Sequence, residues 1–192
     1  MKKDLDLIIL AAGKSSRFGS LKGFAKIKES TLLESAITLH QNNFTGKTIV
    51  VFSNDSLEYK IRLEKRYSEV LFVENPTPEN GPFSSLKIGL EVTTSSHIFM
   101  LPVDCPCRNL HTWLQLSENT SSQSMCIKPS INGKGGHPII ITSELKSIIE
   151  NAPSKDNLKN ILHNLDFTKI QYIEVDDSDV IKNINTLEDL RS

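Results

Sequence analysis

The first part of the chain alternates short aliphatic runs with amphipathic stretches, and this alternation constrains the fold more than any other feature. Three aliphatic runs, at residues 7–10, 47–53 and 70–74, are typical of short buried strands. Between them, Thr31 and Glu34 form a capping box ahead of an amphipathic helix, and residues 56–67 indicate a charged surface helix. This alternating order of strands and helices predicts a mostly parallel sheet with right-handed crossovers.

The rest of the chain continues the same pattern. We expect strands at residues 97–101, 124–128, 139–141 and 170–175, and helices at residues 84–92, from about 109, 144–150, 157–164 and 187–190. Residues 75–82 contain three prolines and a glycine and residues 131–136 contain three glycines, so we expect loops there. No repeat or long linker divides the 192 residues. The sequence therefore predicts a single domain, residues 1–192, folded as a Rossmann-like three-layer α/β sandwich.

The charge balance excludes several kinds of partner. The chain has 22 basic and 23 acidic residues, so bulk electrostatics gives no attraction to nucleic acid or to an acidic membrane. Asp4 and Asp6 interrupt the apolar run after the basic amino terminus, and no stretch is long enough to span a membrane. The three cysteines, Cys105, Cys107 and Cys126, are an odd number and indicate reduced thiols. We therefore expect a cytoplasmic protein.

The segment after the first strand has the composition of a loop that binds polyphosphate. It combines small residues, serines, glycines and two cations: Leu10, Ala11, Ala12, Gly13, Ser15, Ser16, Arg17, Gly19 and Lys22. Small residues let backbone N–H groups approach an anion closely, and glycine can adopt a positive φ. Arg17 supplies a planar guanidinium and Lys22 a mobile ammonium. The alternative is an ordinary strand-to-helix turn with surface lysines.

Two well-known phosphate loops are excluded. The Walker pattern needs a glycine five residues before Gly13, where Ile8 stands. The dinucleotide fingerprint needs glycines where Ala11 and Ser16 stand. A phosphate loop here must therefore belong to another class.

A second candidate site follows the expected strand at residues 97–101. Asp104 lies between Pro102 and Pro106, beyond the carboxyl end of that strand, where ligands of open parallel sheets gather. A carboxylate at this place suits Mg²⁺, which prefers hard oxygen ligands and bridges to phosphates. Alternatively, Asp104 caps the helix that starts near Asn109, or forms hydrogen bonds within its own turn. A phosphate loop at the end of the first strand favours the metal role.

Two further polar segments are weaker candidates. Ser84 and Ser85 stand at the amino end of an expected helix, where they could cap the helix or help to bind an anion. His137 follows two glycines and precedes a proline, so it could line an acceptor site or serve the structure. The residues by themselves leave these alternatives open.

Together these segments resemble the MobA-like nucleotidyltransferases, which attach a nucleotide to molybdopterin, and more broadly the cytidylyl- and sugar-phosphate nucleotidylyltransferases. The resemblance covers essentially the whole chain. It is carried by Leu10-Ala11-Ala12-Gly13-x-Ser15-x-Arg17-Phe18-Gly19-x-x-Lys22, by Pro102-Val103-Asp104-Cys105-Pro106, by Gly136-His137-Pro138 with Ser84-Ser85-Leu86, and by Asn183-Ile184-Asn185-Thr186-x-Glu188-Asp189-Leu190. Cys105 departs from the residue that usually follows the metal aspartate.

The resemblance implies a fold of the nucleotide-diphospho-sugar transferase type and an Mg²⁺-dependent nucleotidyltransferase. Arg17, Lys22 and Asp104 would be catalytic. The nucleotide would contact the small, serine and cationic residues of the first segment and the helix serines: Leu10, Ala11, Ala12, Gly13, Ser15, Ser16, Arg17, Lys22, Ser84 and Ser85. Asp104 would bind the metal with Asn183 or Asn185, and His137 would lie on the acceptor side.

The donor and the acceptor are expectations from the same resemblance. Ala11-Ala12-Gly13 resembles the enzymes that take CTP, whereas Gly81-Pro82 and Asn183-Ile184-Asn185 are closer to the guanylyl branch. We expect CMP transfer from CTP to a phosphorylated acceptor such as molybdopterin, with possible transient contact with a molybdoenzyme. The alternatives are a GTP-dependent guanylyltransferase, a cytidylyltransferase for sugar phosphate or phosphocholine, and a non-catalytic nucleotide-binding cofactor carrier.

Overall fold

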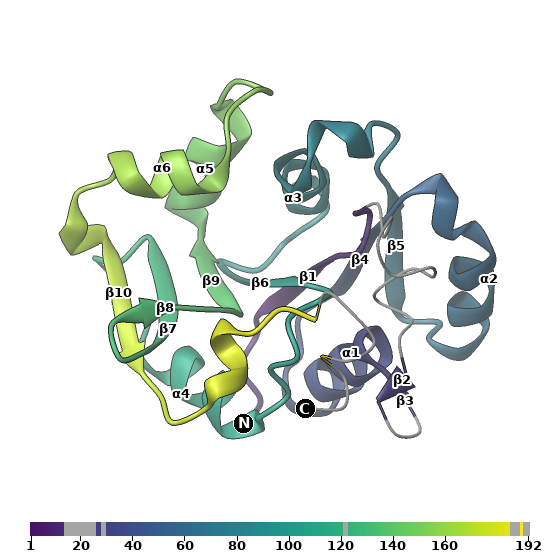
Figure 1. Ribbon diagram of the computed structural model, residues 1–192, viewed down its shortest axis with the longest axis horizontal. Coiled ribbons are helices and arrows are strands. Elements are labelled where there is room, and N and C mark those ends of the chain that lie inside the picture. The colour runs from purple at the N-terminus through teal and green to yellow at the C-terminus, as the bar shows by residue number, and fades with distance from the viewer. Residues whose placement is uncertain (14–25, 28–29, 121–122, 185–188, 190–192) are drawn as a thin grey trace.

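Among the residues that the structure describes, eight strands form one mixed sheet with helices on both faces (Figure 1). The computed structural model describes residues 1–13, 26–27, 30–120, 123–184 and 189. The main strands are β1 (Asp6–Leu10), β4 (Thr48–Phe52), β5 (Val70–Glu74), β6 (His97–Pro102), β7 (Cys126–Ile131), β8 (Lys134–Gly135), β9 (Ile139–Thr142) and β10 (Ile170–Glu174). A separate two-stranded sheet pairs β2 (Lys26–Ile27) with β3 (Ser30–Thr31).

The helices divide the core into two apolar layers. They are α1 (Leu32–Asn43), α2 (Leu57–Arg66), α3 (Pro82–Glu91), α4 (Leu110–Glu118), α5 (Ser143–Asn151) and α6 (Leu158–Asn164). Buried residues of α1, α2 and α4 pack with one face of the central strands, and those of α3, α5 and α6 pack with the other face. Alternate residues of β1 belong to different layers, Ile9 to the first and Ile8 to the second, because side chains of a strand alternate between faces. The predicted three-layer sandwich is confirmed.

The strand order places a topological switch point between β1 and β6. The sheet runs β10-β7-β9-β6-β1-β4-β5, and β6, β1, β4 and β5 are all parallel. From β1 the chain moves outward through β4 to β5, and then α3 carries it back to β6 on the other side of β1. In open α/β sheets, ligands bind beyond the carboxyl ends of the strands at such a point.

Local sequence explains several elements. Thr31 caps α1: its hydroxyl accepts the amide of Glu34 at 3.1 Å, and its own amide donates to the Glu34 carboxylate at 3.0 Å, which completes the predicted capping box. All five residues of β4 are buried, as expected for a strand covered on both faces. The β7–β8 hairpin turns at Asn132 and Gly133, both with positive φ.

Several expectations about secondary structure are corrected. The strand β9 runs antiparallel to both β6 and β7, so the sheet is mixed. The segment at residues 75–82 contains a short 3₁₀ turn, Pro78–Asn80, and Pro82 is the first residue of α3, where a missing N–H costs nothing. A further 3₁₀ turn, η5 (Ser178–Ile181), was not expected. The predicted helix at residues 187–190 lies almost wholly outside the described residues.

Candidate functional site

The ends of β1 and β6 meet at the switch point. Leu10 pairs with Pro102, and the amide of Val103 donates to the carbonyl oxygen of Leu10 at 3.1 Å. Asp104 follows directly and is half-buried. The predicted phosphate loop follows β1, and the predicted metal ligand follows β6. Both therefore leave the sheet from adjacent strands.

The C-terminal segment reaches the same edge. The amide of Ile184 donates to the backbone carbonyl oxygen of Asp104 at 2.8 Å, which brings Asn183 next to Asp104 in space. The two residues offer a carboxylate and an amide oxygen, the hard donors that Mg²⁺ accepts alongside waters and substrate phosphates. Within residues 1–13, 26–27, 30–120, 123–184 and 189, no group of three or more His, Cys, Asp or Glu could hold a metal. Asp104 does not cap α4, because Asn109 does so by accepting the amide of His111 at 3.0 Å. The other alternative, a hydrogen bond of Asp104 within its own turn, stays open beside the metal role.

The first residues of the predicted phosphate loop are buried or hydrogen-bonded to the sheet. The amide of Ala11 donates to the carbonyl oxygen of Val51 at 2.8 Å, so Ala11 has no N–H to present to a nucleotide. Ala12 is 1% exposed. Gly13 is exposed, its φ is not positive, and a Cβ added to it would meet no described atom within 4 Å. Among the described residues, therefore, neither the backbone conformation nor packing accounts for a glycine at this position.

The other predicted loop residues, Ser15, Ser16, Arg17 and Lys22, lie outside the described residues, and so does Asn185. Leu10 lies at the end of β1 and lines the pocket described below. For Arg17, Lys22 and Asp104, the geometry of a shared phosphate site remains a prediction.

The helix serines are held by one buried asparagine. The side-chain amide of Asn75 donates to the hydroxyl oxygens of Ser84 and Ser85, each at 2.9 Å. The hydroxyl of Ser84 donates back to the carbonyl oxygen of Gly81 at 2.8 Å, and Gly81 is the residue that precedes α3. Neither serine accepts a free N–H of the helix terminus, so the capping alternative is wrong. A role in nucleotide binding stays a prediction.

The turn η5 contacts both the segment that follows β6 and the segment that precedes β9. The amide of His137 donates to the carbonyl oxygen of Val180 at 2.8 Å. The thiol of Cys105 lies 3.8 Å from the carbonyl oxygen of His137 and 3.7 Å from that of Asp179. Burial raises the pKa of Cys105 to about 11, so it is a protonated packing thiol. Cys107 is also buried, and its thiol donates to Asp177 Oδ2 at 3.3 Å.

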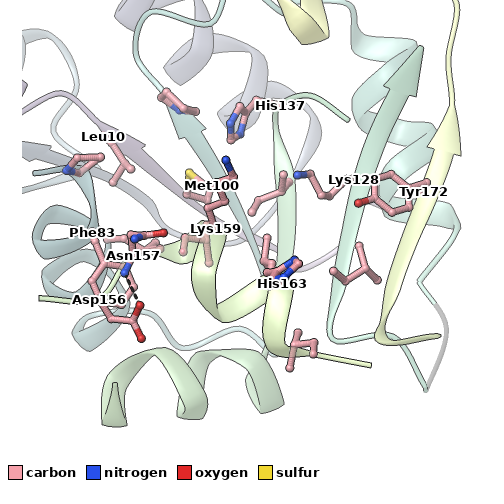
Figure 2. A pocket seen from close by; sticks show the side chains of 18 of the residues that line it. Leu10, Phe83, Met100, Lys128, His137, Asp156, Asn157, Lys159, His163 and Tyr172 are labelled. Carbon is pink, nitrogen blue, oxygen red and sulfur yellow. Dashed lines mark hydrogen bonds between the residues drawn. The ribbon is translucent and has the colours of Figure 1, made fainter. Parts of the chain in front are cut away.

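A pocket of about 720 Å³ opens beside this edge (Figure 2). Leu10 and Pro102, at the ends of β1 and β6, line it together with His137. Its walls are largely apolar and come from α3, β6, β9, α6 and the start of β10: Phe83, Leu86, Met100, Ile139, Leu158, Leu162, Leu165 and Ile170. His137 thus lines the pocket, as expected, and its imidazole Nδ1 is buried without a hydrogen-bond partner in the described part of the chain.

The pocket also contains polar residues that the sequence did not single out. Lys128, Lys159, His163 and Tyr172 line it, on β7, α6 and β10. Lys128 could have been noticed, because it is the one charged residue in the apolar run Cys126–Ile131. A lysine in a buried strand needs either a partner or a function. Lys159, His163 and Tyr172 carry no such signal, since they look like ordinary residues of exposed elements.

No helix among the described residues is long and apolar enough to cross a membrane.

Comparison with known proteins places these features in context. The family model described as "MobA-like NTP transferase domain" matches residues 7–170. The chain is 26% identical over 188 residues to the molybdenum cofactor cytidylyltransferase of Escherichia coli, covering 96% of this chain and 93% of that one. It is 28% identical over 190 residues to a probable molybdenum cofactor guanylyltransferase of Bacillus anthracis, covering 95% and 92%.

Solved structures agree on the fold. A nucleotidyl transferase from Methanothermobacter thermautotroptrophicus superposes with a TM-score of 0.77 at 18% identity, covering 97% of this chain and 94% of that chain. At such low identity the likeness shows the fold alone, which is that of the nucleotide-diphospho-sugar transferases.

Proposed function

Because this chain belongs to the MobA-like NTP transferase domain family, we propose that it transfers a nucleoside monophosphate from a nucleoside triphosphate to the phosphate of an acceptor. The observation that carries the proposal is the meeting of β1 and β6, where Val103 bonds to Leu10 and Asp104 follows. A phosphate segment and a metal carboxylate at one switch point form the minimum site for this reaction.

We propose CTP as the donor and molybdopterin as the acceptor. The relative matched over most of both chains at 26% identity is named a molybdenum cofactor cytidylyltransferase, which supports both assignments. Ala11-Ala12-Gly13, expected next to the base, is the segment that favours CTP. The guanylyltransferase named among the relatives makes GTP the competing donor. A transient contact with a molybdoenzyme that takes up the product stays a prediction.

In the proposed reaction, an oxygen of the acceptor phosphate attacks the α-phosphorus in line. The new bond joins that oxygen to the α-phosphorus, and the bond to the bridging oxygen of the β-phosphate breaks, so that pyrophosphate leaves. A phosphate monoester is already anionic, and no general base is required. The contribution of the protein is to position the reactants and to stabilise developing charge.

Each residue has a distinct role in this proposal. Asp104 and Asn183 would hold Mg²⁺, and the chemistry a bound Mg²⁺ supplies is neutralisation of phosphate charge. Arg17 and Lys22 would bind the triphosphate and stabilise the leaving pyrophosphate. Ala12 and Gly13 would let the nucleotide approach the backbone, and Ser84 and Ser85 would contact it from α3.

The test is product identification. The purified protein is incubated with molybdopterin, Mg²⁺ and each of the four common nucleoside triphosphates, and the products are separated by chromatography and identified by mass. We expect the cytidine dinucleotide of molybdopterin with CTP, together with an equal amount of pyrophosphate. The guanine dinucleotide instead would assign the donor to GTP.

Absence of a dinucleotide with every triphosphate would contradict the proposed acceptor. Nucleotide binding without turnover on any phosphorylated acceptor would support the non-catalytic carrier. Pyrophosphate release with sugar phosphates, but not with molybdopterin, would identify the sugar-phosphate alternative.

A further inference from the structure

The pocket beside the switch point has an uneven distribution of charge. Two of the lining residues are cationic, Lys128 and Lys159, and two more are the histidines His137 and His163. Among the described residues that line it, Asp156 is the only carboxylate, and its Oδ1 already accepts the amide of Asn157 at 2.8 Å. The chain as a whole has a net charge of −1, so this excess of basic groups is local. Such a pocket attracts an anion.

Lys128 is the less exposed of the two lysines that line the pocket. It stands on β7, and a Cβ added to Gly135 of the adjacent β8 would lie 3.3 Å from its Cε and 3.5 Å from its Nζ. The lysine therefore runs past the hairpin backbone, and Figure 2 shows its ammonium directed into the pocket, toward the side where His137 lies. In the described part of the chain, no carboxylate lies within ion-pair distance of Lys128.

His137 offers a neutral group at the same end of the pocket. Burial lowers the pKa of its imidazole to about 4, and the nearby charge of Lys128 lowers it further in the same direction. The ring is therefore neutral near pH 7 and has one N–H to donate and one lone pair to accept. Its buried Nδ1 has no described partner, which is costly unless a ligand or water supplies one.

Two of the aromatic residues that line the pocket are exposed. Phe167 is 85% exposed and Tyr172 is 54% exposed, and both line the pocket. Aliphatic residues such as Leu162 and Ile170 line the same pocket. Large exposed aromatic side chains at the rim of an apolar pocket favour a planar ligand that can pack against them.

We propose that Lys128 and His137 bind the phosphate of the acceptor, and that the acceptor is the phosphomonoester of a molecule with a planar ring system. Leu10 and Pro102 line the same pocket, so a phosphate held in it lies near the strand ends where we expect the donor. Lys128 supplies the charge and His137 a directed hydrogen bond, while the aromatic rim selects the body of the acceptor. This inference rests on the proposed function for the identity of the ligand as an acceptor.

The probe is phenyl phosphate, titrated into protein labelled with ¹⁵N histidine, with binding followed through the imidazole resonances of His137. We expect saturable shifts for wild-type protein. Lys128→Met should weaken binding by about tenfold or more, because a charge-assisted contact of this kind is lost. Lys128→Arg should retain most of the binding. Lys134→Met, on the same hairpin but exposed and outside the pocket lining, removes the same charge and should leave binding unchanged.

Two further measurements show where phenyl phosphate binds and which chemical class of ligand the pocket prefers. Lys22→Ala should leave binding of phenyl phosphate unchanged; if this variant loses binding and Lys128→Met does not, the probe sits in the donor loop and the inference is wrong. Glycerol 3-phosphate should bind less tightly than phenyl phosphate, and the reverse order would overturn the planar class. If Lys134→Met weakened the binding of phenyl phosphate as much as Lys128→Met does, the loss would be due to general electrostatics and the role of Lys128 would be overturned.

Failure of the proposed function is distinguishable from failure of this inference. Binding of phenyl phosphate is measured without a nucleotide, so it can depend on Lys128 even if no nucleotidyl transfer is found. Conversely, binding of CTP to Lys128→Met should equal that of wild type, because Lys128 lines the acceptor side of the switch point.

Discussion

The amide of Ile184 and the carbonyl oxygen of Asp104 are joined by a hydrogen bond of 2.8 Å, although the residues are far apart in the sequence. The bond fixes the C-terminal segment against the end of β6. It therefore places the backbone of Asn183 close to that of Asp104, the residue that we expect to bind Mg²⁺. Because this contact uses the backbone of Asp104, the side chain can be replaced without removing it.

Asp104→Ala should abolish turnover at any concentration of Mg²⁺ and leave the fold intact. The variant loses the proposed metal carboxylate but keeps the backbone bond to Ile184. Steady-state rates over a range of Mg²⁺ concentrations and a thermal unfolding curve make the test. Asp176→Ala, at an exposed position after β10, is the matched control. Near-normal rates in Asp104→Ala would remove the metal assignment.

Lys22→Ala should lower the turnover rate by about 10²-fold or more if the ammonium stabilises the leaving pyrophosphate. Its effect on the unfolding temperature should be small. Single-turnover rates with saturating nucleoside triphosphate give the measurement, and Lys155→Ala, exposed between α5 and α6, is the control. A change in stability with an unchanged rate would make Lys22 an ordinary surface residue.

Gly136→Ala should destabilise the protein by about 1–3 kcal/mol, the usual cost of forcing an extra methyl group into packed structure. A Cβ at residue 136 would lie 2.2 Å from the carbonyl oxygen of Val180, so the loop must move away from η5. That movement breaks the bond from His137 to Val180. Urea denaturation measures the loss.

Gly13→Ala is the contrasting glycine variant. A Cβ at Gly13 meets no described atom within 4 Å, so the free energy of unfolding should stay unchanged. Binding of the nucleoside triphosphate should weaken if the ligand packs against this backbone. Equal destabilisation in the two variants would contradict the distinction between a packing glycine and a ligand-facing glycine.

Stability should fall as the pH falls from about 6.5 to about 4, partly because of His40. This residue is fully buried, its Nε2 lies 2.8 Å from the carbonyl oxygen of Leu5, and its Nδ1 lies 2.8 Å from Thr48 Oγ1. Burial lowers its pKa from 6.5 to about 4. Between these values the unfolded chain binds the proton and the folded chain does not, so acid favours unfolding by up to roughly 3 kcal/mol.

The check is urea denaturation at several pH values for wild type and for His40→Gln. The substitution removes the titrating group, so its unfolding free energy should depend less steeply on pH over this window. The two curves should run parallel above pH 7, where His40 is neutral in the folded and unfolded states. Identical slopes between pH 4 and 6.5 would show that other groups cause the acid sensitivity.

The sequence alone determined the local elements and the first strands of the sheet. The capping box at Thr31 and the doubly buried run of β4 depend on contacts within a few residues or on simple periodicity, and both are present as expected. Asp104 could be located beyond a strand end because prolines and an apolar run mark that end. Each of these features depends only on residues that are close together in the sequence.

Only the tertiary structure decided which segments meet. The antiparallel direction of β9, the junction of η5 with Cys105 and His137, and the entry of Lys128 into the same pocket as Lys159 all join segments that are distant in sequence. Hydrophobic periodicity specifies that a strand is buried but not which neighbour buries it. Strand order and direction follow from the packing of the whole core, and a binding pocket is what that packing leaves open.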